Sequence, residues 1–324
     1  MRVFRSLDEA AAVELHRAVV TLGMFDGVHI GHRRVIEHVV SLARERAGEA
    51  VVVTFGRHPR AVIEKRAPKL ITSLPHKLRI FEALGVTAVL VLEFDHALCA
   101  TPAREFARKV LGEVLAAEVV LLGYNNRFGR GGEGDITLLE EVGRDAGFEA
   151  RQLGEVRLEG EPLSSTAIRE AILEGDLDRA ASMLGRPASV LGTVERGDGL
   201  GKQIGFPTAN LDLHHEVRPP PGVYGCEAVV GGQRCFGLVN IGTRPTLHGD
   251  PAPEGWEARD REERIEVHLL DFEGDLYGQD VEVVFLVRLR DERRFDGLDA
   301  LVAQIRQDRE VFHGWLEGAP GRDR

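Results

Sequence analysis

The sequence predicts two domains, an α/β domain with a doubly wound parallel sheet followed by a mainly antiparallel β domain. Its 324 residues are enough to bury two separate cores. The first half alternates short, apolar, β-branched runs with helical patterns, which is typical of a parallel sheet covered by helices. From Val190 onward, short strands follow one another closely, which favours an antiparallel barrel or sandwich. We therefore expect domains at residues 1–187 and 188–324.

The overall composition limits the kind of partner. The formal net charge is −11, which argues against nucleic acid or an anionic membrane as the main partner. No apolar run approaches the roughly 20 residues of a membrane helix, and the N-terminus lacks the apolar core of a signal peptide. Three cysteines without a C-x-x-C pair fit a reducing compartment. We expect a cytoplasmic protein that works on small molecules and forms at most a weak homo-oligomer.

Strands and helices alternate through the first half. Buried strands are expected at residues 18–20, 49–55, 87–94 and 118–123. Helices are expected at about residues 33–43, 75–84, 101–117, 137–147 and 176–184, with N-caps at Thr101, Thr137 and Asp176. Ligands of such a sheet bind at the carboxyl ends of its strands. Polar clusters that follow the first, second and fourth strands are therefore candidate site residues.

The most informative cluster is the glycine-rich stretch Thr21–His32, which follows the first strand and precedes a helix. Its three evenly spaced glycines let the backbone approach a ligand, and the helix start offers free N–H groups to a phosphate. His29 and His32, three residues apart, can donate hydrogen bonds to phosphoryl oxygens. One alternative is a glycine-rich turn with two surface histidines. Another is a metal site, but Zn²⁺ needs three or four ligands, and the next histidine, His38, lies on a different side of the helix from His32.

Two later segments of the first half also suit phosphate binding. The loop at residues 123–135 contains Arg127, Arg130 and five glycines, although a flexible surface loop has the same composition. Ser164, Ser165 and Thr166 place three hydroxyls and free N–H groups at a helix start. Arg169 follows one turn later. This group can hold a triphosphate and the charge that develops as pyrophosphate leaves, whereas helix capping alone explains one serine.

In the second half, the loop Gly197–Asn210 contains the most candidate residues for binding phosphate and metal. The amides of Gly205 and the other glycines can face phosphates, and Pro207 stiffens the backbone. Thr208 and Asn210 then present two hard oxygens that suit Mg²⁺ carrying a nucleotide. The alternative for this segment is a turn with local side-chain caps.

The remaining elements of the second half predict a barrel and a candidate base. Strand candidates are residues 190–196, 223–230, 233–240, 264–270 and 281–290, and an amphipathic helix from Leu298 to Trp315 covers one side. In the strand at 264–270, the apolar residues alternate with Glu266 and His268, which share the other face. A solvated strand face would show the same alternation.

Several of these motifs resemble one known family, the bacterial bifunctional riboflavin kinase/FMN adenylyltransferases, a branch of the HxGH nucleotidyltransferases. The stretch from Gly23 to His32 resembles the signature G-x-F-D-G-x-H-x-G-H, and Leu163–Arg169 resembles I-S-S-T-x-I-R. The residues from Gly205 to Asn210 resemble the riboflavin kinase signature G-x-P-T-A-N, and Arg264–Leu270 is similar to the kinase strand that carries E-x-H. The resemblance covers nearly the whole chain.

The resemblance implies a Rossmann-like nucleotidyltransferase domain and a riboflavin-kinase-type barrel with a C-terminal helix. It implies that the protein phosphorylates riboflavin to FMN with ATP, then adenylylates FMN to FAD and releases pyrophosphate. Its implied catalytic residues are Glu266, His29, His32 and Arg169, and Mg²⁺ is implied on Thr208 and Asn210. The implied nucleotide-binding residues are Gly23, Phe25, Asp26, Gly27, His29, His32, Asn125, Arg127, Ser164, Ser165, Thr166, Arg169, Gly205 and Pro207.

The chain departs from the family pattern at two places in the first half. The family usually has T-F-D-P-H-P where this chain has Thr54-Phe-Gly-Arg-His-Pro59, so the acidic residue and the first proline are replaced by Gly56 and Arg57. In the segment similar to V-G-x-D/N-F-x-F-G, Asn126 replaces an aromatic residue. An alternative is therefore a monofunctional riboflavin kinase whose first domain is inactive or is a nucleotide-binding regulatory module.

Overall fold

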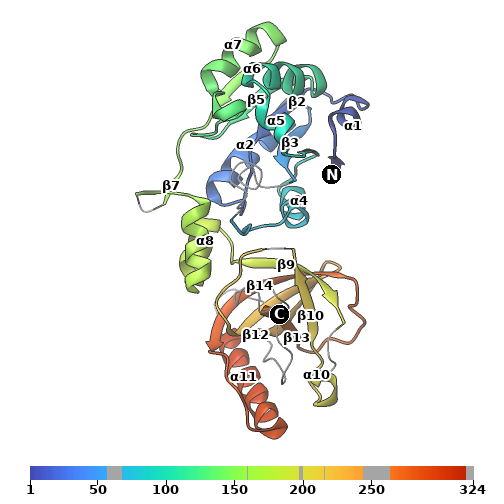
Figure 1. The fold of residues 1–324 in the computed structure, drawn as a ribbon, viewed down its shortest axis with the longest axis vertical. Coiled ribbons are helices and arrows are strands. Elements are labelled where there is room, and N and C mark those ends of the chain that lie inside the picture. Colours follow the sequence, from blue (N-terminus) through green and yellow to red (C-terminus); the bar gives the residue numbers. More distant parts are fainter. Residues whose placement is uncertain (57–67, 159, 197–199, 215, 244–262, 319–324) are drawn as a thin grey trace, which may run out of the picture. The chain divides into compact units, whose positions relative to one another are not determined.

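The computed structural model describes residues 1–56, 68–158, 160–196, 200–214, 216–243 and 263–318. Its contacts divide the chain into two compact units, which are described separately (Figure 1). One unit comprises Met1–Ile168 with Met183–Gly185, and the other comprises Arg169–Ser182 with Arg186–Arg324.

The first unit is built on a six-stranded, fully parallel sheet in the order β1-β4-β3-β2-β5-β6. Its strands are β1 (Arg2–Phe4), β2 (Ala18–Leu22), β3 (Ala50–Phe55), β4 (Ala88–Leu92), β5 (Ala117–Leu122) and β6 (Glu149–Gln152). The predicted parallel sheet is confirmed. The two edge strands were not predicted, because β1 is three residues long and β6 has the mostly polar sequence EARQ.

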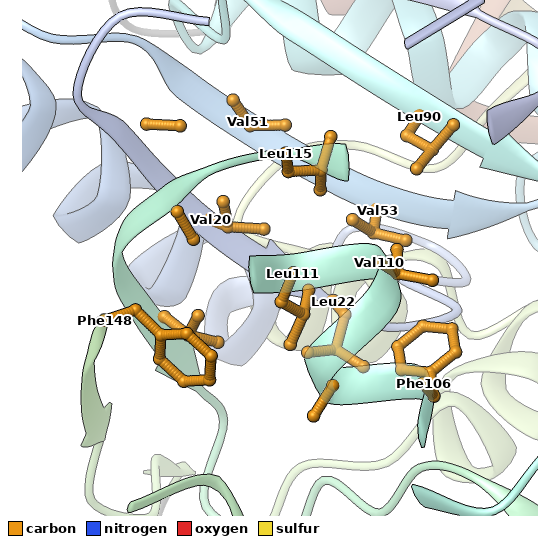
Figure 2. Packing of buried hydrophobic residues seen from close by; sticks show 14 of the residues in the cluster. Val20, Leu22, Val51, Val53, Leu90, Phe106, Val110, Leu111, Leu115 and Phe148 are labelled. Atoms are coloured by element: carbon orange, nitrogen blue, oxygen red, sulfur yellow. The ribbon is translucent and has the colours of Figure 1, made fainter. Parts of the chain in front are cut away.

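Helices cover both faces of this sheet (Figure 1). Successive residues of a strand point to opposite faces, so Val19 packs toward α2 (Ile30–Glu45) and α4 (Leu74–Ala83). Val20 packs toward the other helices, which are α1 (Leu7–Ala11), α6 (Ala103–Phe106), η1 (Ala107–Val114) and α7 (Ile136–Ala146). Figure 2 shows this second core, in which Leu111 lies beside Leu22 and Phe106 beside Val110.

Two of the predicted N-caps in this unit are wrong. The helix expected at residues 101–117 is α6 followed directly by η1 and ends at Val114. Thr101 instead ends a preceding short helix, α5 (His96–Ala100), by donating a hydrogen bond to the Ala97 carbonyl at 2.9 Å. Helix α7 is capped by Asp135, which accepts from the Leu138 N–H at 3.1 Å, in place of Thr137. An ionised carboxylate two residues earlier provides the stronger acceptor for the free N–H groups.

After the sheet, the chain forms the short hairpin β7 (Arg157–Leu158) and β8 (Glu161–Pro162), then α8 (Ser165–Glu174) and α9 (Leu177–Leu184). The predicted cap of α9 is confirmed, since the Asp176 carboxylate accepts from the Arg179 N–H at 3.0 Å. Helix α9 ends at Gly185, whose φ of 70° is accessible to glycine at little cost.

The second unit is a closed antiparallel barrel in the order β10-β13-β12-β11-β14-β9 (Figure 1). Its strands are β9 (Ser189–Glu195), β10 (Ala209–Leu213), β11 (Gly222–Val230), β12 (Gln233–Thr243), β13 (Glu263–Leu269) and β14 (Asp280–Arg290), and a short helix α10 (Leu200–Gln203) precedes β10. The predicted barrel is confirmed. Strand β10 was not predicted, and its first two residues, Ala209 and Asn210, were assigned to the glycine-rich loop.

The predicted C-terminal helix is α11 (Leu298–Gly318), which packs on β14 and β11. Its Phe312 is fully buried, and a Cβ atom at Gly225 of β11 would lie 2.2 Å from the ring of Phe312. Glycine at that position therefore leaves the space that the aromatic ring fills. In the described part of the chain, no helix combines the length and the apolarity needed to span a bilayer.

Candidate functional sites

The first candidate site is the turn at residues 23–29, at the carboxyl end of β2. Phe25 and Val28 have φ values of 50° and 40°, which side-chain-bearing residues rarely adopt. Helix α2 begins earlier than expected, at Ile30, so His32 lies in its first turn and His29 is its N-cap. Strained backbone of this kind persists only where surrounding contacts hold it.

Asp26 supplies one of these contacts. It is 3% exposed, and its Oδ1 accepts hydrogen bonds from the N–H groups of Ile71 at 2.8 Å and Thr72 at 3.2 Å. In return, the Gly27 N–H donates to the Thr72 hydroxyl at 3.0 Å. The carboxylate that was expected near the nucleotide thus ties the turn to the segment before α4.

The two histidines lie against each other. Their rings are stacked with centroids 3.6 Å apart, and the Phe25 ring meets His32 edge-on at 5.3 Å. A Cβ atom at Gly31 would lie 3.2 Å from the His29 ring, so glycine there keeps the ring in place. The Nδ1 of His29 accepts the His32 N–H at 3.4 Å, which assigns the ring proton of neutral His29 to Nε2.

His32 is held neutral. Burial lowers its pKa well below the usual 6.5, and the positive charges of His29 and Lys77 lower the pKa further. Among the described residues, its Nδ1 has no hydrogen-bond partner although it is buried. A buried polar atom without a partner is costly, so a ligand atom is the natural partner for this nitrogen.

Lys77 was not predicted as part of this site. It is 1% exposed, and its Nζ donates to the Met24 carbonyl at 3.0 Å and to the Thr54 hydroxyl at 3.4 Å. Burial lowers the pKa of Lys77 to about 8, while the charge of Asp26 opposes that shift. The sequence contained one signal, because Lys77 lies four residues before Phe81, on the buried face of α4.

The start of α8 reaches the same turn. Ser164 caps the helix by accepting from the Ala167 N–H at 3.2 Å, and the Ser165 hydroxyl donates to the Asp26 carbonyl at 3.0 Å. Thr166 is exposed. Arg169 lies one turn further along α8. The structure thus brings Ser164–Thr166 beside the glycine-rich turn.

The loop after β5 is more ordered than its composition suggests. Arg127 forms an exposed ion pair with Asp135 at 2.9 Å, and Asn125 is exposed. The Asn126 side chain donates a hydrogen bond to the Leu22 carbonyl, at the end of β2. The asparagine that replaces the family's aromatic residue therefore links this loop to the strand before the histidines.

The other departure lies at the end of β3. A Cβ atom at Gly56 would lie 3.1 Å from Oε2 of Glu93, which follows β4. A carboxylate is therefore present next to the position where the family carries an acidic side chain. Residues 57–59, with the expected His58 and Pro59, lie outside the described residues.

The second candidate site is a cavity of about 320 Å³ on the outer face of the barrel wall, where strands β10, β12 and β13 face helix α11. Three of its polar residues stand in a row across neighbouring strands, because Glu266 of β13 pairs in register with Asn210 of β10 on one side and Asn240 of β12 on the other. Cross-strand neighbours on one face lie about 5 Å apart. The carboxylate is thus flanked by two carboxamides.

The site also fits a hard cation that arrives with a nucleotide. Asn210 Oδ1 is buried and has no hydrogen-bond partner among the described residues, and Thr208 lines the same cavity from an exposed position. No cluster of three or more His, Cys, Asp or Glu side chains suited to a metal occurs in the described part of the chain. Two neutral oxygens fit Mg²⁺ that is bound mainly by phosphates and water.

The loop before β10 is fixed from the barrel side. His268 Nδ1 lies 2.8 Å from the Pro207 carbonyl, and the rings of His268 and Phe206 meet edge-on at 5.4 Å. Gly205 is exposed with a φ of 84°. Residues 197–199 of the predicted loop lie outside the described residues. The contacts with His268 position the segment that carries Thr208.

One further group at the cavity escaped sequence analysis. Arg290 Nε lies 3.0 Å from both carboxylate oxygens of Asp308 on α11, and Gln304 Nε2 donates to the same carboxylate at 2.7 Å. Arg290 and Arg293 also flank the ring of Phe295 at 5.7 and 4.9 Å. This network joins α11 to the end of β14 beside the cavity.

Comparison with known proteins gives a consistent result for both halves. Residues 11–167 match the family model for FAD synthetase, and residues 184–316 match the family model for riboflavin kinase. A relative from Escherichia coli (strain K12) is 37% identical over 318 residues, covering 96% of this chain and 98% of the relative. A relative from Bacillus subtilis (strain 168) is 33% identical over 302 residues, covering 92% of each chain. Both are described as bifunctional riboflavin kinase/FMN adenylyltransferases.

A solved structure is similar along the whole chain. It is a crystal structure from Streptococcus pneumoniae with 30% sequence identity and a TM-score of 0.77, covering 97% of this chain and 98% of its own. Its title describes a macrolide-efflux protein, an activity unlike that of the curated relatives. Because curated relatives match both halves in order and over nearly the full length, the chain belongs to the bifunctional riboflavin kinase/FMN adenylyltransferase family.

Proposed function

We propose that the protein converts riboflavin to FMN and FMN to FAD, using one ATP in each step. The observation that carries the proposal is that each half of the chain combines a family match with a local site geometry. The first half has the stacked histidines at the carboxyl end of β2, and the second half has Glu266 between two asparagines in a cavity. We assign adenylyl transfer to residues 1–187 and the kinase to residues 188–324.

In the kinase step, the riboflavin 5′-hydroxyl oxygen attacks the γ-phosphorus of ATP and ADP leaves. Glu266 takes the hydroxyl proton, a role suited to a carboxylate inside a cavity. Thr208 and Asn210 would hold Mg²⁺, which when bound offsets the negative charge of the phosphates. The segment from Gly205 to Pro207 faces the nucleotide with its backbone. Positioning and charge neutralisation supply most of the rate.

In the adenylyl transfer step, a phosphate oxygen of FMN attacks the α-phosphorus of ATP, and pyrophosphate leaves as the α–β bridging bond breaks. His29 and His32 donate hydrogen bonds to phosphoryl oxygens, and burial lowers the pKa of His32 so that its ring is neutral. Positive charge comes from Arg169 and from the N-terminus of α2. Ser164–Thr166 supply hydroxyls beside the same turn.

The other predicted nucleotide-binding residues of the first half shape the turn or contact the nucleotide. Gly23 and Gly27 let the backbone approach the phosphates, whereas Phe25 and Asp26 hold the shape of the turn. Asn125 and Arg127 lie on the loop after β5 and contact the nucleotide from that side. The relatives with both domains do not favour the alternative of a monofunctional kinase. Asn126, one of the departures that suggested this alternative, holds the loop after β5 against the end of β2, next to the site.

Flavin chromatography tests this proposal directly. The full chain is incubated with riboflavin, ATP and Mg²⁺, and riboflavin, FMN and FAD are separated over time. We expect FMN first and FAD afterwards. A second incubation starts from FMN and measures pyrophosphate release, which should match the FAD formed. If the first incubation yields FMN but no FAD, and the second yields neither FAD nor pyrophosphate, adenylyl transfer is excluded.

A further inference from the structure

The clearest group left unused by the proposed chemistry is the buried ammonium of Lys77. A lysine that is 1% exposed lies directly beneath the turn that carries the histidines. Burying a charged group is costly unless hydrogen bonds and opposite charge compensate. Its two hydrogen bonds go to the Met24 carbonyl and to the Thr54 hydroxyl, and Asp26 supplies the nearby negative charge.

The contacts of Lys77 belong to a clamp between two segments that are distant in sequence. The turn donates through the Gly27 N–H to Thr72 and accepts through Asp26 from the N–H groups of Ile71 and Thr72. Lys77, one turn into α4, adds a hydrogen bond to the carbonyl of Met24. The segment from Ile71 to Lys77 thus holds both ends of the turn.

The clamp affects the positions of the histidines because it holds a strained segment of backbone next to them. Phe25 and Val28, on either side of Asp26, both have positive φ values, so the turn relaxes unless it is held. The Phe25 ring touches His32, and Val28 directly precedes His29. A shift of Met24 would therefore move both imidazole rings away from the phosphates they serve. A misplacement of about 1 Å can cost roughly 100-fold in rate.

We propose, on the basis of the adenylyl transfer proposed above, that Lys77 is a positioning residue of that site, holding the turn at residues 23–28 so that His29 and His32 meet the phosphates. Its second effect is electrostatic. The ammonium contributes to the lowered pKa of His32 and so favours the neutral ring. Lys77 itself touches neither substrate in this account.

The test uses the full chain with Lys77→Met, which keeps the length of the side chain and removes its charge and donors. We expect kcat for FAD formation from supplied FMN to fall by about 100-fold, with KM values for FMN and ATP changed less than threefold. FMN formation from riboflavin should stay at the wild-type rate, which controls for enzyme concentration, and circular dichroism and thermal unfolding check that the first unit is folded. Lys109→Met, the same substitution on an exposed residue of η1, should change neither rate.

A spectroscopic readout separates positioning from a merely structural role. In protein labelled at histidine carbon atoms, the NMR titration of His32 should move to higher pH in Lys77→Met, because a neighbouring positive charge is gone. An unchanged kcat for FAD formation, or an unshifted His32 titration, would overturn the proposal. If wild-type protein makes no FAD from FMN, the proposed adenylyl transfer itself fails, which is a different outcome.

A second variant applies if Lys77→Met does not yield folded protein. Thr54→Val keeps the shape of the side chain but removes the hydroxyl that accepts from Lys77 and donates to the Met24 carbonyl at 3.3 Å. We expect kcat for FAD formation to fall about tenfold, the change that corresponds to the loss of a typical buried hydrogen bond. A wild-type kcat in Thr54→Val would then overturn the proposal.

Discussion

Glu266→Gln is the substitution that isolates the kinase chemistry. Glu266 lines the barrel cavity between Asn210 and Asn240, and glutamine has the same length and shape as glutamate. The amide can still accept hydrogen bonds, but it cannot take the proton of the riboflavin 5′-hydroxyl. The substitution therefore removes general base catalysis and leaves the cavity volume and the strand register unchanged.

The size of the effect follows from the role of the base. Proton transfer by a positioned side chain contributes about 10²–10⁴-fold, so the barrier for FMN formation should rise by about 2.7–5.4 kcal/mol. The assay measures FMN from riboflavin and FAD from supplied FMN on the same sample by chromatography. FAD formation should remain at the wild-type rate, because the adenylyl transfer residues lie in the other half of the chain.

A matched control sets the background for this experiment. Glu273→Gln makes the same chemical change at an exposed residue after β13 and should leave both rates unchanged. Thermal unfolding should show that both variants keep the wild-type midpoint within a few degrees. Retention of more than about one tenth of the FMN-forming rate in Glu266→Gln would refute the assignment of Glu266 as the base.

The other predictions concern the metal, His32 and the C-terminal helix. Asn210→Ala should raise the Mg²⁺ concentration for half-maximal FMN formation by at least about tenfold, and an unchanged Mg²⁺ titration would remove Asn210 from the metal site. Because the pKa of His32 is lowered in the folded state, the unfolded chain binds the additional proton, so stability should fall as the pH drops below 6.5. In His32→Asn this decline, measured by urea unfolding at pH 5–7, should be shallower, and an identical slope would contradict a neutral buried ring. Gly225→Ala should lower stability by about 1–3 kcal/mol because its Cβ meets the Phe312 ring, and calorimetry with an unaltered midpoint would argue against that packing.

The parts of the sites that sequence could predict are the contiguous ones. The twelve residues from Thr21 to His32 contain the end of β2, the turn and the start of α2. The structure places both histidines together, as their spacing suggests. The serines at the start of α8 are similar, since an N-cap is decided by neighbouring residues. Such features depend on local geometry, which is visible in one segment.

The parts that could not be predicted depend on partners distant in the chain. Lys77 reaches Met24 across 53 residues, and a lysine on an apolar helix face does not reveal what accepts its hydrogen bonds. The row of Asn210, Glu266 and Asn240 arises because β13 lies between β10 and β12 in the closed barrel. Strand order and register follow from the complete fold, and shifting one strand by a single residue would turn its side chain to the other face.

The choice of N-cap for α7 shows a third limit. Thr137 and Asp135 both precede the apolar residues of the helix, and either can accept a free N–H. The structure selects Asp135, which also pairs with Arg127 on the loop after β5. The ambiguity between these two local signals is resolved in favour of the ionised carboxylate, the stronger acceptor of the two.

The central claim is that one chain carries two separate sites that act in sequence, and a mixing experiment tests it most directly. His32→Ala, which loses one donor to the phosphates, should still make FMN but form FAD about 10²–10³-fold more slowly. Glu266→Gln should do the reverse. Given riboflavin, ATP and Mg²⁺, neither variant alone should yield appreciable FAD, whereas an equal mixture should convert riboflavin to FAD through released FMN. A mixture that makes no more FAD than the two variants make separately would contradict the account.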